Sequence, residues 1–177
     1  IVGKKDPFTI EHQERVAALA VAMGERMGLD EASREELRVA GLVHDVGKIE
    51  VAGEILNKPG KLSRIEFELV KEHPRSGYEI LLGVDFPWPV AEVTYQHHER
   101  LDGSGYPRGL KGDAILLESR IIAVADVVEA ISAHRPYRPA LGLDAAIEEI
   151  TSKAPLFGHD VVDACLSLLR ENPNILL

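Results

Sequence analysis

The sequence predicts an all-α domain, and three observations support this prediction. Apolar residues make up 45% of the 177 residues and aromatic residues only 5%, a composition that suits packed helices better than a β-sandwich. Apolar positions recur at helical spacing along most of the chain. No hairpin signal and no alternating run of useful length competes with that spacing.

Two long helices are expected near the start of the chain. The first covers residues 6–28, with Thr9 as its N-cap and Gly28 at its end. The second runs from Asp30, as its cap, to Gly47. The buried stripe of the first helix is expected to contain Val16, Leu19, Met23 and Met27.

Residues 63–73 predict a third helix. Ser63 and Glu66 have the spacing of a capping box at its start. Pro74 disfavours helical geometry in the residue before it, so this helix should end near His73.

Further helices are expected at 76–83, 89–98, 117–133, 142–154 and 159–172. The segment 117–133 is apolar nearly all round, which predicts the central buried helix. Pro89 suits the first turn of the helix that it opens. Cys165 lies in an apolar stretch and is expected to be plain core.

Composition and charge exclude several classes of protein. The net charge is −9 and no basic face is visible, so a nucleic acid polymer is not an expected partner. No window approaches ~18 uncharged apolar residues, so this domain is not expected to contact a membrane. A single cysteine excludes an internal disulfide and fits the reducing cytoplasm. The chain opens with Ile1 rather than Met, which indicates a piece of a longer protein.

Histidine and aspartate side chains fall on the inward faces of five predicted helices. His73, for example, lies four residues after Leu69 and eight after Ile65. A lone histidine on an apolar face is more often a satisfied core residue, but a buried aspartate is costly unless paired or metal-bound. Seven such residues together favour a metal site. They are His12, His44, Asp45, His73, His97, His98 and Asp126.

These residue types also narrow the choice of metal. Imidazole and carboxylate ligands without thiolate suit Fe, Mn, Zn, Ni or Co, and argue against Cu(I) or an iron–sulfur cluster. Seven ligands exceed what one ion usually takes. Two divalent ions about 3.5–4 Å apart, bridged by a carboxylate, would use them all and leave positions open for water.

The motifs around these residues resemble the HD-GYP domain, a branch of the HD phosphohydrolase superfamily. "HDVGK" at 44–48 and "HHERLDGSGYP" at 97–107 carry the resemblance most specifically. The segments "DPFTIEHQERVA", "KEHPRSGYEIL", "RIIAVADVVEAI" and "RPYRPAL" extend it, in order, over residues 6–172. The resemblance implies one HD-GYP domain over 1–177, a bundle of about seven to eight helices excised from a longer multidomain signalling protein.

Membership of this family implies a metal-dependent phosphodiesterase that hydrolyses cyclic di-GMP to linear pGpG, and in some members on to GMP. Metal-activated hydroxide at a di-metal site would attack the phosphodiester. Fe or Mn is favoured, with Ni, Co or Zn as alternatives. The resemblance also implies bacterial signal transduction, as in a two-component response regulator, with a GGDEF domain as a partner through the GYP loop and a homodimer as a further expectation.

The resemblance assigns roles by motif position. The seven residues of the candidate metal site would be the ligands, with Asp45 bridging the ions. Lys48 would contact the scissile phosphate and the attacking hydroxide. The remaining substrate contacts would be Arg135, Arg138, Gly105, Tyr106 and Pro107. Residues expected to orient the ligating imidazoles are Glu99, Arg100 and Asp102.

Some interpretations stay open at this point. Arg135 and Arg138 suit a solvated helix end as well as substrate phosphates, and Tyr106 suits loop packing as well as stacking on substrate. Some family members hold a third metal with a glutamate where this chain has Phe8, so two metals are expected. His134 and His159 fall outside the ligand pattern and are expected to be surface or capping residues.

Two alternative functions also remain. One is an HD-superfamily phosphohydrolase acting on another cyclic dinucleotide or on a nucleotide. The other is a non-catalytic module that binds a nucleotide or a GGDEF partner. The complete set of expected ligands favours the phosphodiesterase over the non-catalytic module. The motif "HHERLDGSGYP" argues against a generic member of the superfamily, and substrate testing would decide between the two enzymes.

Overall fold

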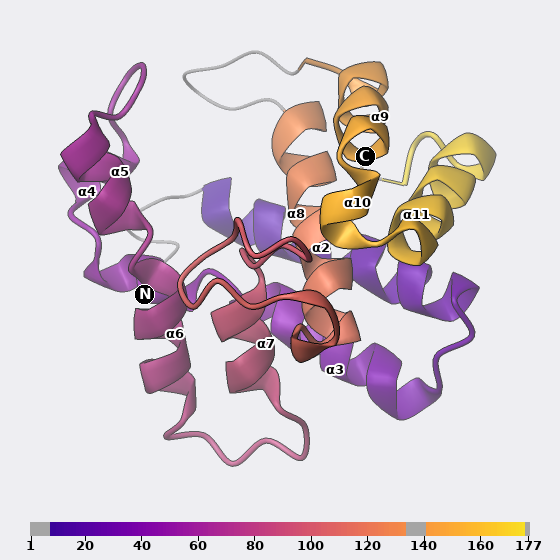
Figure 1. The fold of residues 1–177 in the computed structure, drawn as a ribbon, viewed down its shortest axis with the longest axis horizontal. Coiled ribbons are helices and arrows are strands. Elements are labelled where there is room, and N and C mark those ends of the chain that lie inside the picture. Colours follow the sequence, from indigo (N-terminus) through magenta and orange to yellow (C-terminus); the bar gives the residue numbers. More distant parts are fainter. Residues whose placement is uncertain (1–7, 134–140, 176–177) are drawn as a thin grey trace.

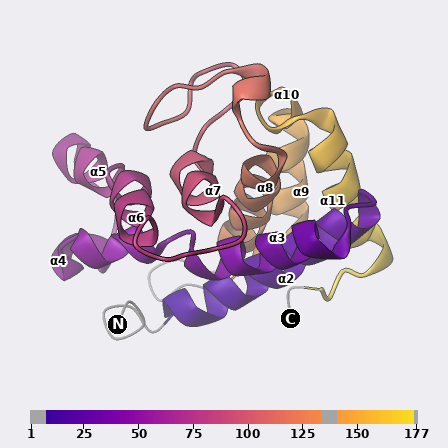
Figure 2. The ribbon, with the colours of Figure 1, turned by 90° about the horizontal axis from the view of Figure 1, so that it is seen from below.

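The computed structural model describes residues 8–133 and 141–175, and every regular element within these ranges is helical. The predicted all-α class is therefore confirmed. Helices α2 (Phe8–Arg26) and α3 (Glu31–Val43) form a long pair that lies side by side along one edge of the molecule (Figure 2). Asp30 caps α3 as predicted, because its side chain accepts a hydrogen bond from the backbone N–H of Ser33 at 2.8 Å.

Helix α8 (Leu117–Ser132) is the central helix. It lies between α7 (Val90–Gln96) and α9 (Leu143–Ser152), as Figure 1 shows, and it also packs on α2. The side chains of Ile121 and Ile122 are fully buried. Burying each aliphatic side chain of this kind stabilises the fold by about 1.5–3 kcal/mol. The prediction of a central buried helix is confirmed.

The C-terminal part covers α8 and α2 on a further side. Helix α10 (Ala154–Phe157) is a single turn that leads into α11 (His159–Glu171), and α11 packs on both α2 and α8. Cys165 on α11 is fully buried and is core, as expected, while His159 is exposed. No helix in the described ranges is long and apolar enough to cross a membrane.

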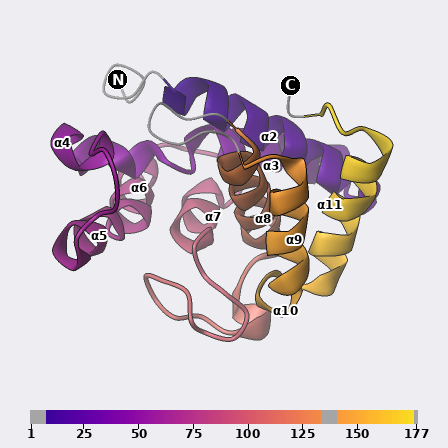
Figure 3. The same cartoon turned by 90° about the horizontal axis from the view of Figure 1, so that it is seen from above.

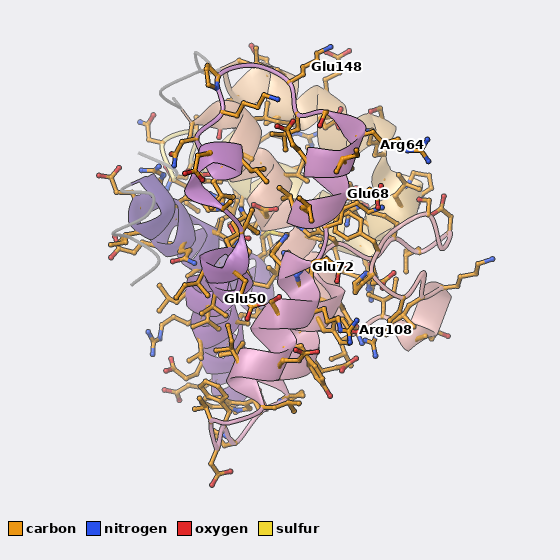
Figure 4. The ribbon with its side chains drawn as sticks, turned by 90° about the vertical axis from the view of Figure 1, so that its left-hand side faces the viewer. Glu50, Arg64, Glu68, Glu72, Arg108 and Glu148 are labelled. Carbon is orange, nitrogen blue, oxygen red and sulfur yellow. The ribbon has the colours of Figure 1, made fainter. Side chains whose placement is uncertain are left out.

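An arm of two short helices stands away from this body. Helices α4 (Gly53–Leu56) and α5 (Arg64–Val70) contain no buried residue, and Figures 2 and 3 both place them at the far end from α11. Arg64 and Glu68 lie along α5 on the side of the molecule seen in Figure 4. The predicted capping box of Ser63 and its partner is present at the start of α5.

Two helix boundaries differ from the prediction near the arm. Helix α3 ends at Val43 rather than Gly47, and after a turn the chain continues as a 3-10 helix, η1 (Val46–Glu50). The helix expected over 63–73 ends at Val70, and His73 begins α6 (His73–Leu81). Pro74 therefore occupies the first turn of a new helix, where its missing N–H has no cost, instead of ending the previous helix.

The start of α2 also differs. The helix begins at Phe8, so Thr9 lies inside it and does not cap it. Pro89 precedes α7 as the residue at its N-cap. The loop between α7 and α8 includes a second 3-10 turn, η2 (Gly112–Ala114), and this loop passes in front of α8 in Figure 1.

Candidate metal centre

One group of side chains brings together α2, the end of α3 and α8. Ligand atoms of His12, His44 and Asp126 all lie within 4.8 Å of one another. Oδ1 of Asp126 is 3.2 Å from Nε2 of His12 and 3.9 Å from Nε2 of His44. Both histidines are buried, and the Asp126 side chain is only 19% exposed. We call these three residues the first trio.

A second group comes from the start of α6 and the end of α7. Ligand atoms of His73, His97 and His98 also lie within 4.8 Å of one another, and Nε2 of His73 is 3.3 Å from Nε2 of His97. His97 follows the last residue of α7 and His98 begins the next loop, so the helix end lets both side chains turn to the same place. We call these three residues the second trio.

Asp45 connects the two trios. Its Oδ1 lies 3.3 Å from Nε2 of His73 in the second trio. Its Oδ2 lies 3.6 Å from Nε2 of His44 and 3.8 Å from Nε2 of His12 in the first trio. The carboxylate is 2% exposed, so it is placed where one bridging ligand between two cations would lie. His44 and Asp45 lie in the turn between α3 and η1.

Three imidazole rings are oriented in the same way. In His44, His73 and His97 the Nδ1 atom faces the backbone carbonyl three residues earlier, at 2.8, 2.7 and 2.5 Å respectively. Each Nδ1–H can therefore donate to a carbonyl, which leaves the lone pair of Nε2 for a cation. In the described part of the chain, Nε2 of His44 is fully buried without a hydrogen-bond partner. An orphaned buried nitrogen of this kind fits a metal ligand.

His12 is oriented by a carboxylate instead of a carbonyl. Its Nδ1 bonds Oε2 of Glu129, and Oε1 of Glu129 accepts from Nε of Arg15 at 2.9 Å. Burial lowers the pKa of His12, but the hydrogen bonds to Asp126 and Glu129 outweigh that effect and raise it to about 9. A carboxylate behind a ligating imidazole fixes the ring and increases its basicity.

Sequence reasoning missed this role of Glu129. Glu129 is 1% exposed and lies three residues after Asp126 on the most apolar helix. That second carboxylate on one buried helix was the available signal, because a buried carboxylate needs a partner.

Burial and neighbouring groups shift the pKa values of the acids and imidazoles in the centre. Burial raises the pKa of Asp45, but the charge of Lys48 and the neighbouring imidazoles of His44 and His73 overcome this effect and hold that pKa well below its usual range. Burial, and then the neighbouring imidazoles of His44 and His73, lower the pKa of His97 to about 3. Neutral imidazole and ionised carboxylate are the forms that bind cations.

His73 is buried at the centre for a reason different from the predicted one. The predicted stripe ran through Ile65 and Leu69, but these side chains are 76% and 51% exposed on α5. His73 is buried because it opens α6, which packs closely on η1. A Cβ atom at Gly47 would lie 1.9 Å from the carbonyl oxygen of His73. Glycine is therefore required between Asp45 and Lys48 for the two backbones to meet.

Glu99, Arg100 and Asp102 were expected to orient the ligating imidazoles, but they make other contacts. Glu99 is buried and accepts from the backbone N–H groups of Arg108 and Leu110, at 2.7 and 2.9 Å. Arg100 donates to the backbone carbonyl of Glu99 at 2.8 Å, and Asp102 accepts from the backbone N–H and hydroxyl of the serine two residues on. Within the described ranges none of the three bonds an imidazole. They hold the loop after α7 in shape instead.

The "GYP" loop borders the second trio. The ring of Tyr106 stacks on that of His98, with ring centres 4.7 Å apart, and its backbone N–H donates to the His98 carbonyl. A Cβ at Gly105 would lie 2.4 Å from the backbone N of Arg100. Gly105 therefore allows close packing, whereas Gly103, with φ of 84°, makes the turn. Pro107 follows Tyr106 through a cis peptide bond.

Lys48 lies at the edge of the centre, with its Nζ 2.6 Å from Oδ2 of Asp45. Arg135 and Arg138, together with His134, lie outside the described residues.

Comparison with known proteins identifies the family. Residues 1–161 match the family model described as HD domain. The chain belongs to the HD domain family. This HD domain is 40% identical over 177 residues to the 3'3'-cGAMP-specific phosphodiesterase 3 of Vibrio cholerae. The alignment covers 99% of the chain and 38% of that protein. It is 43% identical over 165 residues to the cyclic di-GMP phosphodiesterase response regulator RpfG of Xanthomonas campestris, over 92% of the chain and 44% of that protein.

The HD domain therefore spans less than half the length of these curated relatives. Among solved structures, it resembles an HDG"Y"P protein from Bdellovibrio bacteriovorus, with a TM-score of 0.75 and 18% identity over 92% of the chain and 52% of that protein. The prediction of an HD-GYP domain is confirmed by these matches.

Proposed function

We propose that this HD domain is a metal-dependent phosphodiesterase that hydrolyses cyclic di-GMP to linear pGpG. The observation that carries the proposal is the position of Asp45. One oxygen of its carboxylate faces each histidine-containing trio, as a bridging ligand would at a di-metal site. The curated relatives named as cyclic dinucleotide phosphodiesterases support the choice of substrate class.

The two trios would hold one divalent transition-metal ion each, with Fe or Mn favoured. Such ions supply the positive charge that turns a water into a nucleophile near neutral pH and neutralises a phosphodiester. The protein would contribute orientation: the carbonyls behind His44, His73 and His97 keep each Nε2 lone pair directed inward.

The proposed reaction is a simple hydrolysis of one phosphodiester. Water adds to phosphorus, the bond from phosphorus to the 3′ oxygen breaks, and the single linear product carries a 5′-phosphate at one end and a 3′-hydroxyl at the other. Lys48 would donate to the phosphate as negative charge spreads over its oxygens. Arg135 and Arg138 are proposed to hold the second phosphate on the basis of the sequence motif. Because position 8 is Phe8, without a ligand for a third metal, pGpG is the proposed end product.

The decisive experiment is hydrolysis of cyclic di-GMP by protein reconstituted anaerobically with Fe(II) or Mn(II), with products separated by chromatography. Metal-dependent formation of pGpG by the wild type, and its loss in Asp45→Ala, are the expected results. Wild-type protein with both metals bound and no turnover would reject the proposal for this domain.

A second substrate is favoured by one specific observation. The relative that aligns over 99% of the chain is named as specific for 3'3'-cGAMP. The same assay with 3'3'-cGAMP, at equal concentration and in direct competition with cyclic di-GMP, ranks the two substrates by kcat/KM. The predicted GGDEF partner and homodimer remain proposals that rest on the family resemblance.

A further inference from the structure

A pocket of about 250 Å³ lies beside the candidate metal centre, and the "GYP" loop, which is expected to contact substrate, forms part of its lining. His98 of the second trio and Tyr106 of the "GYP" loop contribute to its lining, and so do Glu149 on α9 and Lys153, the residue that follows α9. It is smaller than the roughly 300–1,000 Å³ of a pocket that takes a whole small molecule. It therefore suits one part of a dinucleotide whose phosphate lies at the metal centre.

Flat groups form much of the pocket lining. The guanidinium of Arg100 lies over the ring of Phe157, with Cζ 4.6 Å from the ring centre. Tyr106 and His98 form a second stacked pair with an interplanar angle of 26°. All four residues line the pocket. Proteins stack nucleobases on aromatic rings and on guanidinium planes. Tyr106 is covered by His98 on one side and by Nζ of Lys71, which lies 5.2 Å from the ring centre. The Arg100–Phe157 pair is therefore the part of this lining that suits a planar base.

A donor and an acceptor stand together where α9 meets the pocket. Nζ of Lys153 pairs with Oε1 of Glu149 one helical turn earlier, and the two side chains are 49% and 36% exposed. A ligand entering the pocket from solvent can therefore meet both groups. The carboxylate offers acceptors, and the ammonium beside it offers donors.

This pairing matches one base better than another. The Watson–Crick edge of guanine places the acceptor O6 beside two donors, N1–H and N2–H₂, so a carboxylate can accept two hydrogen bonds while the ammonium donates a third. Adenine offers only one donor group, at N6, and one acceptor, at N1, so the same pair can form only two. We propose that the pocket is a guanine-selective subsite, in which Glu149 accepts from N1–H and N2–H₂ and Lys153 donates to O6. The identification of the ligand as a nucleotide rests on the proposed function.

The ion pair also has an ordinary structural effect, because Glu and Lys four residues apart stabilise a helix. The chain offers a matched control for that effect. Glu148 lies next to Glu149 on the same helix, is exposed and projects outward in Figure 4, and does not line the pocket. A Glu148→Gln variant therefore changes the charge of α9 without changing the pocket.

The test is equilibrium binding of GMP, IMP and AMP to the metal-loaded protein by isothermal titration calorimetry. All three nucleotides carry the same phosphate and ribose, so differences in affinity report the base. Wild type is expected to bind GMP about tenfold more tightly than AMP, with IMP, which lacks N2–H₂, between them. Glu149→Gln is expected to lower the affinity for GMP about tenfold and leave AMP unchanged, while Glu148→Gln leaves both unchanged.

Equal binding of GMP and AMP by wild type would overturn the proposal, and so would equal effects of the two glutamate variants. Thermal melting of each variant checks that α9 is intact, and Lys153→Met provides a second variant that should weaken GMP and IMP but not AMP. Because no turnover is required, the outcome is independent of the proposed function. A guanine-selective protein that hydrolyses no cyclic dinucleotide would keep the subsite and reject the phosphodiesterase.

Discussion

Nζ of Lys48 lies 2.6 Å from Oδ2 of Asp45, the same oxygen that faces His12 and His44. Asp45 is buried, whereas the Lys48 side chain is 27% exposed. Lys48 thus extends from the carboxylate that joins the two trios toward solvent. A cation in that position can meet an anionic substrate while the buried side chains hold the metal.

Replacing Lys48 with Met should therefore separate metal binding from catalysis. The metal content is expected to stay at the wild-type value, because the trios keep their ligand atoms. The kcat for cyclic di-GMP is expected to fall about 10²–10³-fold, the usual effect of removing one donor to a developing negative charge. Metal analysis and steady-state kinetics on the same preparation provide both readings. Lys61→Met, at an exposed position on the arm, is the control. Loss of metal from the Lys48 variant would contradict this division of roles.

Glu129 is predicted to act through His12. Glu129→Gln keeps the size of the side chain but removes the charge that orients the Nδ1–H of His12, so the affinity of the first trio for Mn(II) should fall about 10–100-fold. Glu129→Asp retains a carboxylate and should recover part of that loss. Chelator-competition titration measures both affinities.

The control for this experiment lies on the same helix. Glu118→Gln changes a carboxylate in the first turn of α8 and should leave the metal affinity unchanged. A purely structural role of Glu129 would instead lower the thermal stability of the metal-free protein while leaving the affinity of the folded fraction for Mn(II) intact.

Part of the centre could be predicted from local patterns because His12 and Asp126 lie inside regular helices, and His44 and His97 directly follow helix ends. His12 shares a helical stripe with Val16 and Leu19, which are fully buried. Helix α8 was predicted correctly because a segment that is apolar nearly all round must lie in the core. In each case the period of the helix alone determined which side chains point inward.

The rest depended on contacts between distant parts of the chain. Glu129 meets His12 across 117 positions in the sequence, and no local pattern predicts such a pair. Pro74 is compatible both with the end of one helix and with the first turn of the next, and the contact of α6 with η1 decides between them. The arm is similar: Ile65 has an apolar side chain, but in the described ranges it stays 76% exposed.

A pH dependence of stability is expected from Glu36 on α3. The side chain is 6% exposed, and its Oε1 has no hydrogen-bond partner in the described ranges. Burial, and then the charge of Glu118, raise its pKa from 4.5 to about 7. Between these two values the unfolded chain has released this proton and the folded protein has kept it, so stability falls as pH rises through this window.

Glu36→Gln removes this dependence. The variant should melt at the same temperature as wild type near pH 4 and at a higher temperature near pH 8. Thermal melts of the wild type and of Glu36→Gln at several pH values measure this difference in melting temperature. Glu54→Gln, at an exposed position, is the control. Because all three proteins share the remaining titrating groups, the comparison removes the contribution of those groups. A variant that is less stable than wild type at the higher pH would show that the ionised carboxylate of Glu36 is stabilised by the fold.

Gly47→Ala should disconnect the two trios. The new Cβ would lie 1.9 Å from the carbonyl oxygen of His73 and 2.4 Å from the backbone N of Gly77, and backbone atoms cannot move aside as a flexible side chain can. Helix α6 must shift away from η1, which carries His73 away from Asp45. Overpacking of this kind costs about 1–3 kcal/mol of stability.

The shift also predicts a selective loss of metal. Metal analysis of Gly47→Ala should find fewer ions per chain than in wild type, because the second trio depends on His73, whereas the first trio draws its ligands from α2, the end of α3 and α8. Gly53→Ala is the matched control, since the nearest atom to its new Cβ is the Asn57 side chain at 4.0 Å. Full metal content together with wild-type stability in Gly47→Ala would mean that η1 and α6 can separate without moving His73 from Asp45.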